Sequence, residues 1–592
     1  MNKLLLFFII CISLLSAELI HPPDLASLNY IHVKFRWEPE PEVNEFQFQL
    51  TNDNNVLLID SLVTDTFLII TNEIEWLSTY HWRVHPVNGS WSSLSSFSTQ
   101  ETSVSTFTDV DAVYIDPLIY NPELSLDGIT IYGIMDPYYS AAIDIDGNEI
   151  WNSNQYMFIN MKDNKEFFAN TTFGGETNRE FGVQFTIEDD IVWHEPRIDE
   201  EVEFLQHELI KLPNGNYMGL VPIFFDRNVP HSSHYPELDA MEYHFYFEPF
   251  FGNDAAFSCE WKTEKIVEWD SLGNEIWSWF PNGENGYNLN DFDEFHYWRV
   301  PGQNICLTDP FEWTHFNALA YDETDSSVYV SSKNLSRITK INHNTKEIIW
   351  NLGANLRWWE DLDLNHIIFG NSGQHSLQIL PSGNIVTLDN GVGYNISTAL
   401  EIAITDAGDI FNVDTVWSYT LPEDLYGSLS GNVQKLSNDN YLITTIGRAD
   451  GAYTIEVTPA KQIVWSCKYN VGLPQGKIYR ALRIPDLYNS SYVDNDLSVN
   501  NQYLPNSFLI KSAYPNPFNP IINIEYKLSD PTMVQFEIYN IKGQQIDKIN
   551  QGYQVPGIYN AMWNGENYSS GLYFVTLKNK SKLLTEKIIL LK

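Results

Sequence analysis

The sequence predicts an all-β chain: a six-bladed β-propeller with a β-sandwich segment on either side of it. Six segments repeat one unit, in which a strand and a turn are followed by a second strand that ends on tryptophan. Apolar residues make up 43 % of the chain, including 18 Trp, 33 Tyr and 33 Phe, a composition that suits strands rather than a disordered tail. A length of 592 residues indicates several domains.

The first residues indicate export. Residues 1–17 begin with a basic Lys3, continue with an apolar run of about a dozen residues, and end on the small residues Ser16 and Ala17. The run is too short to span a bilayer, and the pattern is typical of a secretory signal peptide cleaved near Ala17. No later stretch is long and apolar enough for a membrane helix, so we expect no membrane span after cleavage.

The sequence of residues 18–103 predicts a small β-sandwich. Apolar and polar residues alternate in strand fashion at 35–37, 45–50 and 80–84, and further short segments follow at 91–92 and 97–99. This pattern resembles a fibronectin type III module, whose usual role is that of a spacer or packing partner.

Residues 104–490 contain the repeat. Its six copies end on Trp151, Trp193, Trp277, Trp350, Trp417 and Trp465. Each copy is typical of a hairpin, and a second kind of hairpin falls between copies, at Leu212, Leu380 and Leu436. Two hairpins make a four-stranded blade, so six copies predict six blades, with the tryptophans in the core.

Three histidines occupy related places in this repeat. His207 and His375 both open the pattern H-x-L-x-x-L-P-x-G-N, and His315 opens a related stretch that runs to Glu323. Equivalent positions in a propeller converge on its axis, so we expect the three imidazoles to share one central pocket. A neutral imidazole is a competent nucleophile near neutral pH.

Several motifs occur in a fixed order between residues 105 and 490. They are HELIKLPNGN from His207, WTHFNALAYDE from Trp313, GQH from Gly373, LDNG from Leu388 and IYRALRIP from Ile478. In this order they resemble the bacterial arylsulfotransferase family, six-bladed propeller enzymes that need no nucleotide sulfate donor. The resemblance implies sulfuryl transfer from an aryl sulfate to a phenol, by a ping-pong reaction through a sulfated histidine.

The resemblance also implies roles for individual residues. It makes His375 the nucleophile and puts His207, His315 and Asn317 around the sulfuryl group, where they stabilise the transition state. Where the family has an arginine, this chain has Lys333, which keeps the positive charge but loses the two-pronged fork.

Two arginines are weaker candidates for the same site. Arg337 is a rival to Lys333, because a strand continuing that far would put both on one face. Arg480 is a candidate both for the channel and for packing between blades.

Charge and cysteine content limit which partners and metal sites the chain can have. A net charge of −43 makes a nucleic-acid partner unfavourable. Three cysteines remain after the signal peptide, Cys259, Cys306 and Cys467, and a Cys259–Cys306 disulfide is compatible with export. No cysteine spacing resembles a zinc site, and we expect neither a metal nor a cofactor.

The C-terminal segment differs in character. Residues 491–508 are rich in Asn and Ser and predict a linker. Residues 509–592 have nine Lys against six acidic residues, a charge of +3 that leaves −46 on the rest of the chain. The series AYPNPFNP from Ala513, VQFEIYN from Val534 and SSGLYF from Ser569 resembles the sorting domain of the bacterial type IX secretion system. It implies a partner in that machinery and export across both membranes to the cell surface or medium.

The leading hypothesis is therefore an exported aryl-sulfate sulfotransferase that acts on a small aryl sulfate donor and a phenolic acceptor. The alternative is a non-catalytic surface propeller that binds a ligand or partner in the same pocket, a reading that the lysine at position 333 supports. A third reading is a sulfatase-like hydrolase with water as acceptor. No C-x-P-x-R or S-x-P-x-R motif occurs, which disfavours the formylglycine sulfatases.

Overall fold

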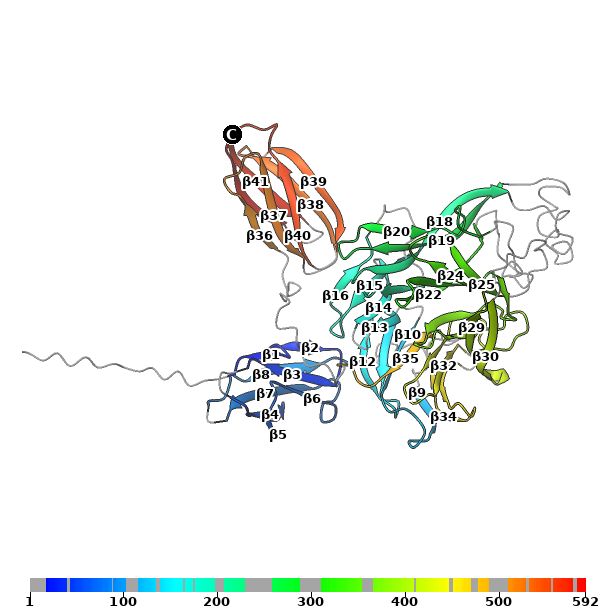
Figure 1. Ribbon diagram of the computed structural model, residues 1–592. Helices are drawn as coiled ribbons and strands as arrows, with labels where there is room; N and C mark the ends of the chain where they lie inside the picture. The colour runs from blue at the N-terminus through cyan, green and yellow to red at the C-terminus, as the bar shows by residue number, and fades with distance from the viewer. Residues whose placement is uncertain are drawn as a thin grey trace, which may run out of the picture. The chain divides into compact units, whose positions relative to one another are not determined.

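The fold is taken from a computed structural model of the chain (Figure 1). The residues that it describes are 17–39, 43–87, 89–102, 115–134, 139–162, 166–173, 176–196, 207–228, 258–287, 310–353, 366–408, 411–446, 451–469, 478–488, 509–528, 532–542, 544–554, 557–578 and 583–592. Of the sequence predictions, most of the signal peptide, the linker 491–508 and Cys306 with its disulfide lie outside these residues.

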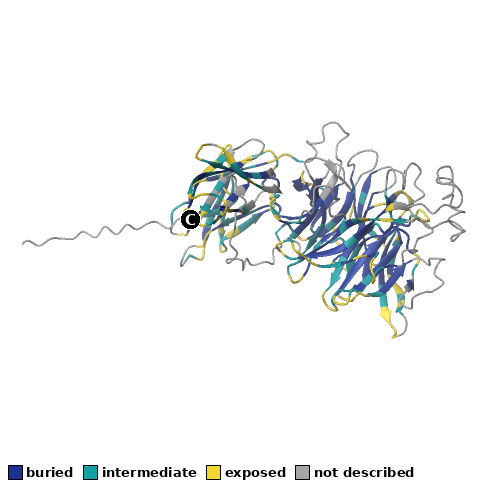
Figure 2. Ribbon diagram, turned by 90° about the horizontal axis from the view of Figure 1, so that it is seen from above, coloured by how far each residue is buried: buried dark blue, intermediate teal, exposed yellow. Residues whose placement is uncertain are grey.

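Strands dominate the described residues, as the sequence predicts, and one short 3-10 helix, η3 (Glu423–Leu425), accompanies them. No helix in this part of the chain has the length and apolar character needed to cross a membrane. The chain divides into two compact units, residues 1–491 and 492–592. In Figure 2 buried residues run along the strands, while many exposed residues sit at the turns between them.

The N-terminal part of the first unit is a pair of sheets. The three-stranded sheet has the order β1-β3-β6 and the five-stranded sheet the order β2-β8-β7-β4-β5. Their strands are β1 (Leu19–His21), β2 (Ala26–Leu28), β3 (Val33–Trp37), β4 (Phe46–Asn52), β5 (Leu57–Val63), β6 (Phe67–Ile70), β7 (Thr79–Pro86) and β8 (Ser95–Thr99). Buried and half-buried residues alternate along β3 and β8, so one face of each sheet supplies the core. Phe35 and Trp82 meet edge to face there, 5.1 Å apart.

Six sheets of four or more strands follow in the described part of residues 115–484, coloured cyan to yellow in Figure 1. Sheet 1 contains β10 (Ile129–Ile134), β11 (Tyr139–Ile143), β12 (Glu149–Ser153) and β35 (Ile478–Ile484). Sheet 2 contains β13 (Met157–Lys162), β14 (Glu166–Phe173), β15 (Glu176–Phe185) and β16 (Ile191–His194). Sheet 3 contains β17 (Leu209–Lys211), β18 (Tyr217–Asn228), β19 (Ser258–Trp269), β20 (Glu275–Trp279) and β21 (Phe311–Glu312).

Sheet 4 contains β22 (Phe316–Asp322), β23 (Ser327–Ser332), β24 (Arg337–Asn342), β25 (Ile348–Gly353) and β26 (His366–Ile368). Sheet 5 contains β27 (His375–Ile379), β28 (Ile385–Asp389), β29 (Thr398–Asp406) and β30 (Phe411–Thr420). Sheet 6 contains β31 (Asn432–Lys435), β32 (Tyr441–Thr445), β33 (Ala452–Val457), β34 (Ile463–Tyr469) and β9 (Ile115–Tyr120).

Four of the six repeated tryptophans join their sheet to the next one. Each of the six lies on the fourth strand of its sheet, counted from the inner strand (β35, β13, β17, β22, β27 or β31), and four indole N–H groups donate to a backbone carbonyl in a hairpin turn of the following sheet. The four pairs are Trp151 with Ile187, Trp277 with His343, Trp417 with Pro459 and Trp465 with Ile145. The last pair runs from sheet 6 back to sheet 1. The repeat therefore marks a contact between sheets as well as a core residue.

The inner strand is one end strand of each of the six sheets, and it contacts the inner strands of two other sheets, in cyclic order. β35 of sheet 1 is followed by β13, β17, β22, β27 and β31, and β31 contacts β35 again. Strands from both ends of the segment complete the cycle, because β35 pairs with β10 in sheet 1 and β9 pairs with β34 in sheet 6. The arrangement is propeller-like.

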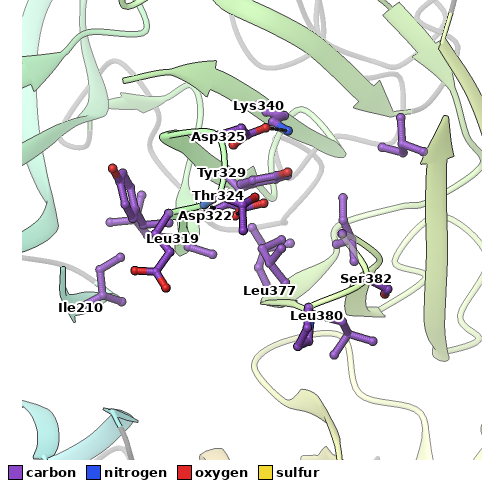
Figure 3. Close-up of a pocket in the computed structure, with 18 of the residues that line it drawn as sticks. Ile210, Leu319, Asp322, Thr324, Asp325, Tyr329, Lys340, Leu377, Leu380 and Ser382 are labelled. Atoms are coloured by element: carbon purple, nitrogen blue, oxygen red, sulfur yellow. Dashed lines mark hydrogen bonds and ion pairs between the residues drawn. The ribbon is translucent and has the colours of Figure 1, made fainter. Parts of the chain in front are cut away.

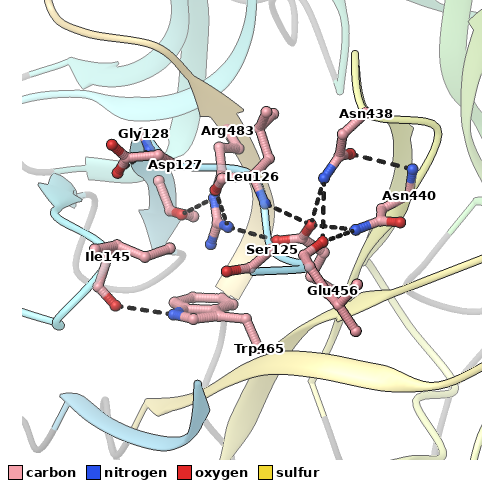
Figure 4. A network of polar contacts seen from close by, with 12 residues as sticks. Ser125, Leu126, Asp127, Gly128, Ile145, Asn438, Asn440, Glu456, Trp465 and Arg483 are labelled. Carbon is pink, nitrogen blue, oxygen red and sulfur yellow. Dashed lines mark hydrogen bonds and ion pairs between the residues drawn. The ribbon is translucent and has the colours of Figure 1, made fainter. Parts of the chain in front are cut away.

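A buried ion pair holds the closing sheets together (Figure 4). Arg483 of β35 donates to a carboxylate oxygen of Glu456 of β33 at 2.8 Å, and both side chains are fully buried. The other oxygen of Glu456 accepts from the side chains of Asn438 and Asn440 and from the backbone N–H of Leu126. Sheets 1 and 6 are thus bonded to each other through side chains.

The N-terminal sandwich pairs with the outer edge of sheet 1. The backbone N–H of Ile31 donates to the carbonyl of Ile150, and that of Asn152 donates to the carbonyl of Asn29. An exposed sheet edge is a site of unwanted pairing, and this contact covers part of it. The packing role expected for residues 18–103 agrees with this contact, while their type III character and the boundary near residue 103 stay predictions.

The second unit is again made of two sheets, with the orders β36-β37-β40 and β39-β38-β41-β42. Their strands are β36 (Leu509–Tyr514), β37 (Ile521–Leu528), β38 (Thr532–Asn540), β39 (Gln545–Gln554), β40 (Gly557–Asn564), β41 (Gly571–Lys578) and β42 (Leu583–Leu590). Ile524, Phe536 and Val575 are fully buried between them.

Candidate functional site

The three histidines of the repeat lie together, where three neighbouring inner strands begin. His207 stands two residues before the start of β17, His315 directly precedes β22, and His375 is the first residue of β27. The ring centroids of His207 and His315 are 4.8 Å apart, and those of His207 and His375 are 6.5 Å apart. His207 and His315 have backbone φ angles of 65° and 48°, in the left-handed region that non-glycine residues rarely adopt. Such strain clusters at functional sites.

One nitrogen of His375 is held by the next sheet. Its Nδ1 lies 2.8 Å from the carbonyl oxygen of Gly431, and since a carbonyl only accepts, Nδ1 carries the hydrogen. A neutral imidazole then has its lone pair on Nε2. Burial lowers the pKa of His375 well below its ordinary value, and the nearby charges of Arg480 and Lys333 lower it further. The ring is therefore held neutral, in one tautomer, with its lone pair on Nε2.

His207 is also kept neutral. Burial lowers its pKa well below the ordinary range, and His315, His375, Lys262 and Lys333 act in the same direction. The Tyr479 hydroxyl donates to the carbonyl oxygen of His207 at 3.0 Å and lies 3.3 Å from its Nδ1. Tyr479 comes from β35, so sheet 1 helps to position a histidine of sheet 3.

His315 has a carboxylate partner three residues before it. Its Nδ1 lies 2.9 Å from a carboxylate oxygen of Glu312, and Lys262 Nζ lies 3.7 Å from the other. Burial raises the pKa of Glu312, but His315, Lys262 and Lys333 outweigh it and hold the pKa at about 2. Glu312 is thus an anion across the whole physiological range and fixes the orientation of the His315 ring.

The structure separates the two candidate cations Lys333 and Arg337. Strand β23 ends at Ser332, the chain turns over residues 333–336, and β24 starts with Arg337 opposite Ser332. The expectation that both side chains share one face does not apply, because no strand connects them. The guanidinium of Arg337 lies 4.7 Å from the centre of the Tyr287 ring, whereas the charge of Lys333 acts on His207 and His375.

Arg480 and Asn317 hold the inner strands together. The Arg480 guanidinium donates to the carbonyls of Ile159 and Asn317 and to the carboxylate of Glu208, so it links sheets 1, 2, 3 and 4. Asn317 Nδ2 donates to the carbonyl oxygen of Gln374 at 2.8 Å, which links sheet 4 to sheet 5 directly before His375. Both residues thus have a positioning role that the sequence motifs do not reveal.

A cavity lies elsewhere, at the other ends of the inner strands (Figure 3). It measures about 1120 Å³, and Ile210, Leu319 and Leu377 line it, each two to four residues beyond a site histidine. An ion pair of Lys340 with Asp325 lies at its side. The histidine cluster is therefore distinct from this cavity. No three His, Cys, Asp or Glu side chains within the described ranges are placed to hold a metal ion.

Family models match two parts of the chain. Residues 254–480 match the model described as arylsulfotransferase (ASST), and this segment includes His315, Lys333 and His375. This part of the chain is therefore similar to the arylsulfotransferase family. His207 precedes the matched segment, although its ring lies within the same cluster. The match supports arylsulfotransferase activity.

The second match identifies the C-terminal unit. Residues 512–591 match the secretion system C-terminal sorting domain. The chain therefore combines a segment similar to the arylsulfotransferase family with a tail for type IX secretion to the cell surface or the extracellular space. A search of curated proteins found no match.

Solved structures similar to this chain are distant in sequence. The β-propeller domain of Cps50 (Swd1) from Myceliophteria thermophila has 10 % identity and a TM-score of 0.31, covering 60 % of this chain and 89 % of that one. A quinonprotein alcohol dehydrogenase-like protein from Bacteroides thetaiotaomicron has 9 % identity and a TM-score of 0.28, covering 78 % and 98 %. Likeness at this level carries no argument about the activity of this chain.

Sequence reasoning missed several residues of the cluster. Glu312 stands three residues before His315, a spacing that points to a histidine partner only once the local fold is known. Tyr479 lies within a quoted motif, but nothing in the motif shows that its hydroxyl reaches sheet 3. Gly431 acts through its backbone carbonyl, so no side-chain signal exists for it.

Proposed function

We propose that the chain is an exported aryl-sulfate sulfotransferase that works through a sulfated histidine and needs no nucleotide sulfate donor. The observation that carries the proposal is the fixed, neutral His375 beside two further histidines and a lysine, inside a segment similar to the arylsulfotransferase family. We further propose that the six sheets are the six blades of a closed propeller, with this cluster near its axis. The fibronectin-like module and the signal peptide belong to the same proposal.

In the first half-reaction, the Nε2 lone pair of His375 attacks the sulfur of an aryl sulfate. The sulfur–oxygen bond to the aryl group breaks, and its electron pair leaves with the phenolate. The resulting ring carries the sulfuryl group on Nε2 and a hydrogen on Nδ1, and Nδ1–H donates a hydrogen bond to the Gly431 carbonyl oxygen. In the second half-reaction the oxygen of a phenol attacks sulfur while the phenol gives its proton to a base in the site. The nitrogen–sulfur bond breaks, and His375 regains its lone pair.

The other side chains have supporting roles in this proposal. His207, His315 and Lys333 bind the sulfuryl oxygens, which carry negative charge throughout the transfer. A preorganised donor of this kind is worth about 10²–10³ in rate. Asn317 contributes by holding the backbone before His375, and Arg480 by holding the inner strands and lowering the pKa of His375.

The test is a turnover assay with 4-nitrophenyl sulfate, with and without added phenol. The proposal predicts one equivalent of nitrophenol without phenol, continued release with phenol, and no release by His375→Ala. His81→Ala, a histidine of the N-terminal sandwich that is 25 % exposed, is the matched control and keeps full activity. Continued release without phenol would instead indicate hydrolysis, and binding without any release would indicate a non-catalytic binding protein.

A further inference from the structure

Lys333 lies between the backbone segments that present two of the three histidines. Its backbone N–H donates to the carbonyl oxygen of His315 at 3.1 Å. On the other side, its Cγ lies 3.8 Å from the point where a Cβ on Gly373 would stand, two residues before His375. The residue is only 8 % exposed, so its ammonium group is held away from bulk solvent, and its charge acts on His207 and His375.

The groups that face Lys333 differ in their ability to move a proton. His207 and His375 are kept neutral, and each has its pKa well below the ordinary value because it is buried. Glu312 stays ionised and bonded to His315, with Lys262 on its other oxygen. Arg480 is bonded to Glu208 and two carbonyls, and a guanidinium does not release its proton near neutral pH.

Lys333 differs from all of these. Burial lowers its pKa to about 8, an effect that the negative charge of Glu312 opposes in part. An acid–base catalyst works best when its pKa lies near the operating pH. At neutral pH the group is therefore mainly an ammonium, yet it can give up and regain a proton during one reaction cycle.

We propose that Lys333 is the acid–base catalyst of both half-reactions, in addition to binding the sulfuryl group. This inference rests on the proposed function. When the bond between sulfur and the aryl oxygen breaks, the Lys333 ammonium gives a proton to the departing oxygen and becomes a neutral amine, so the product leaves as a phenol. In the second half-reaction the neutral amine takes the proton of the acceptor phenol, whose oxygen attacks sulfur while the nitrogen–sulfur bond breaks.

The role has a consequence for the substrate class. A 4-nitrophenolate is a stable leaving group and needs little protonation, whereas an unsubstituted phenolate is more basic and needs a proton as it leaves. General acid catalysis contributes typically 10²–10⁴ in rate. Lys333 thus suits the site to aryl sulfates and phenols without electron-withdrawing substituents.

The experiment compares two donors, phenyl sulfate and 4-nitrophenyl sulfate, in single-turnover assays of the wild type, Lys333→Arg and Lys333→Met. Each result is the ratio of the phenyl sulfate rate to the 4-nitrophenyl sulfate rate, which does not depend on how much of a variant is folded. Lys333→Arg keeps the positive charge but cannot transfer a proton. The proposal predicts that this ratio falls about 10²-fold or more in both variants.

The pH dependence gives a second readout. In the wild type the phenyl sulfate rate declines above about pH 8, where Lys333 loses its proton, and in Lys333→Arg this decline is absent. Lys265→Arg, which exchanges a lysine paired with Glu275 outside the cluster, is the control and keeps both the ratio and the decline.

An unchanged ratio in Lys333→Arg would overturn the acid–base role. If that result came with sulfation of His375 in the wild type, the proposed function would stand. A wild type that transfers no sulfuryl group to His375 would contradict the proposed function itself.

Discussion

The imidazole Nδ1 of His375 lies 2.8 Å from the backbone carbonyl oxygen of Gly431. The two residues belong to adjacent sheets, and Gly431 in turn donates its N–H to the carbonyl of Tyr479, on the sheet after that. Because a backbone carbonyl neither titrates nor rotates freely, the contact fixes which nitrogen of His375 carries the lone pair. Which nitrogen of His375 carries the lone pair thus depends on contacts among sheets 5, 6 and 1.

The low pKa of His375 predicts an unusual pH dependence of the reaction rate on the acidic side. The first half-reaction needs neutral His375, so its rate falls only when the pH drops below the pKa, which lies well below 6.5. An ordinary histidine would lose about tenfold in rate between pH 7 and pH 5.5. We expect the single-turnover release of nitrophenol to change less than twofold over that interval. A tenfold loss at pH 5.5 would contradict the burial and charge effects assigned to the ring.

Glu312 makes folding stability depend on acid. Its folded pKa of about 2 lies below the ordinary 4.5, so its contribution is complete above pH 4.5 and is lost as the pH falls towards 2. Linkage then gives a loss of about 2 kcal/mol by pH 3. Urea unfolding of the wild type and Glu312→Gln checks this, because the difference in unfolding free energy between them shrinks by that amount from pH 7 to pH 3. Equal differences at the two pH values would show that Glu312 has no depressed pKa.

The pair of Glu208 and Arg480 predicts a large stability effect. The two side chains are 2 % and 6 % exposed, and removing one partner of a buried pair costs about 3–5 kcal/mol. We expect Glu208→Gln to lower the unfolding free energy by that amount. Lys265→Met, which breaks the more exposed pair with Glu275, serves as the control and costs about 0–1 kcal/mol. Similar losses of unfolding free energy in both variants would show that the buried Glu208–Arg480 pair stabilises the fold no more than an exposed pair does.

The tryptophan bond between the last and first sheets can be tested in the same way. Trp465 is fully buried and its indole N–H donates to the carbonyl of Ile145 at 2.9 Å. Trp465→Phe keeps an aromatic ring but leaves that carbonyl without its donor, at a cost of about 1–3 kcal/mol. Trp76→Phe, whose indole bonds the carbonyl of Glu149 from the sandwich, is the control for an indole outside the ring. An unchanged unfolding free energy in Trp465→Phe would show that this bond does not stabilise the contact between the last and first sheets.

Part of this structure could be predicted from the sequence. The turn-plus-tryptophan unit predicts hairpins because turn residues and strand periodicity are local, and all six hairpins are present. The shared motif of His207 and His375 predicts that they meet, since equivalent positions lie at equivalent places in a repeat, and their rings are 6.5 Å apart.

The remainder depends on contacts between residues distant in the sequence. The partner of Trp465 lies 320 residues away, and Arg480 bonds the carbonyl of Ile159 from 321 residues away. The expectation that Arg337 and Lys333 lie on one face of a strand does not apply, for a local reason. The chain turns at residues 333–336, where Ser336 adopts a φ of 46°. The spacing of two residues predicts which face of a sheet they share only if one unbroken strand contains both.

The account rests on His375 as the residue that carries the sulfuryl group. The most direct measurement is mass spectrometry of peptides from the full chain after brief reaction with 4-nitrophenyl sulfate and no acceptor. The account predicts a sulfuryl adduct on the peptide that contains His375, lost on addition of phenol and absent from His375→Ala. An enzyme that turns over with phenol but shows no adduct on His375, or shows it on His207 or His315 instead, would contradict the assignment.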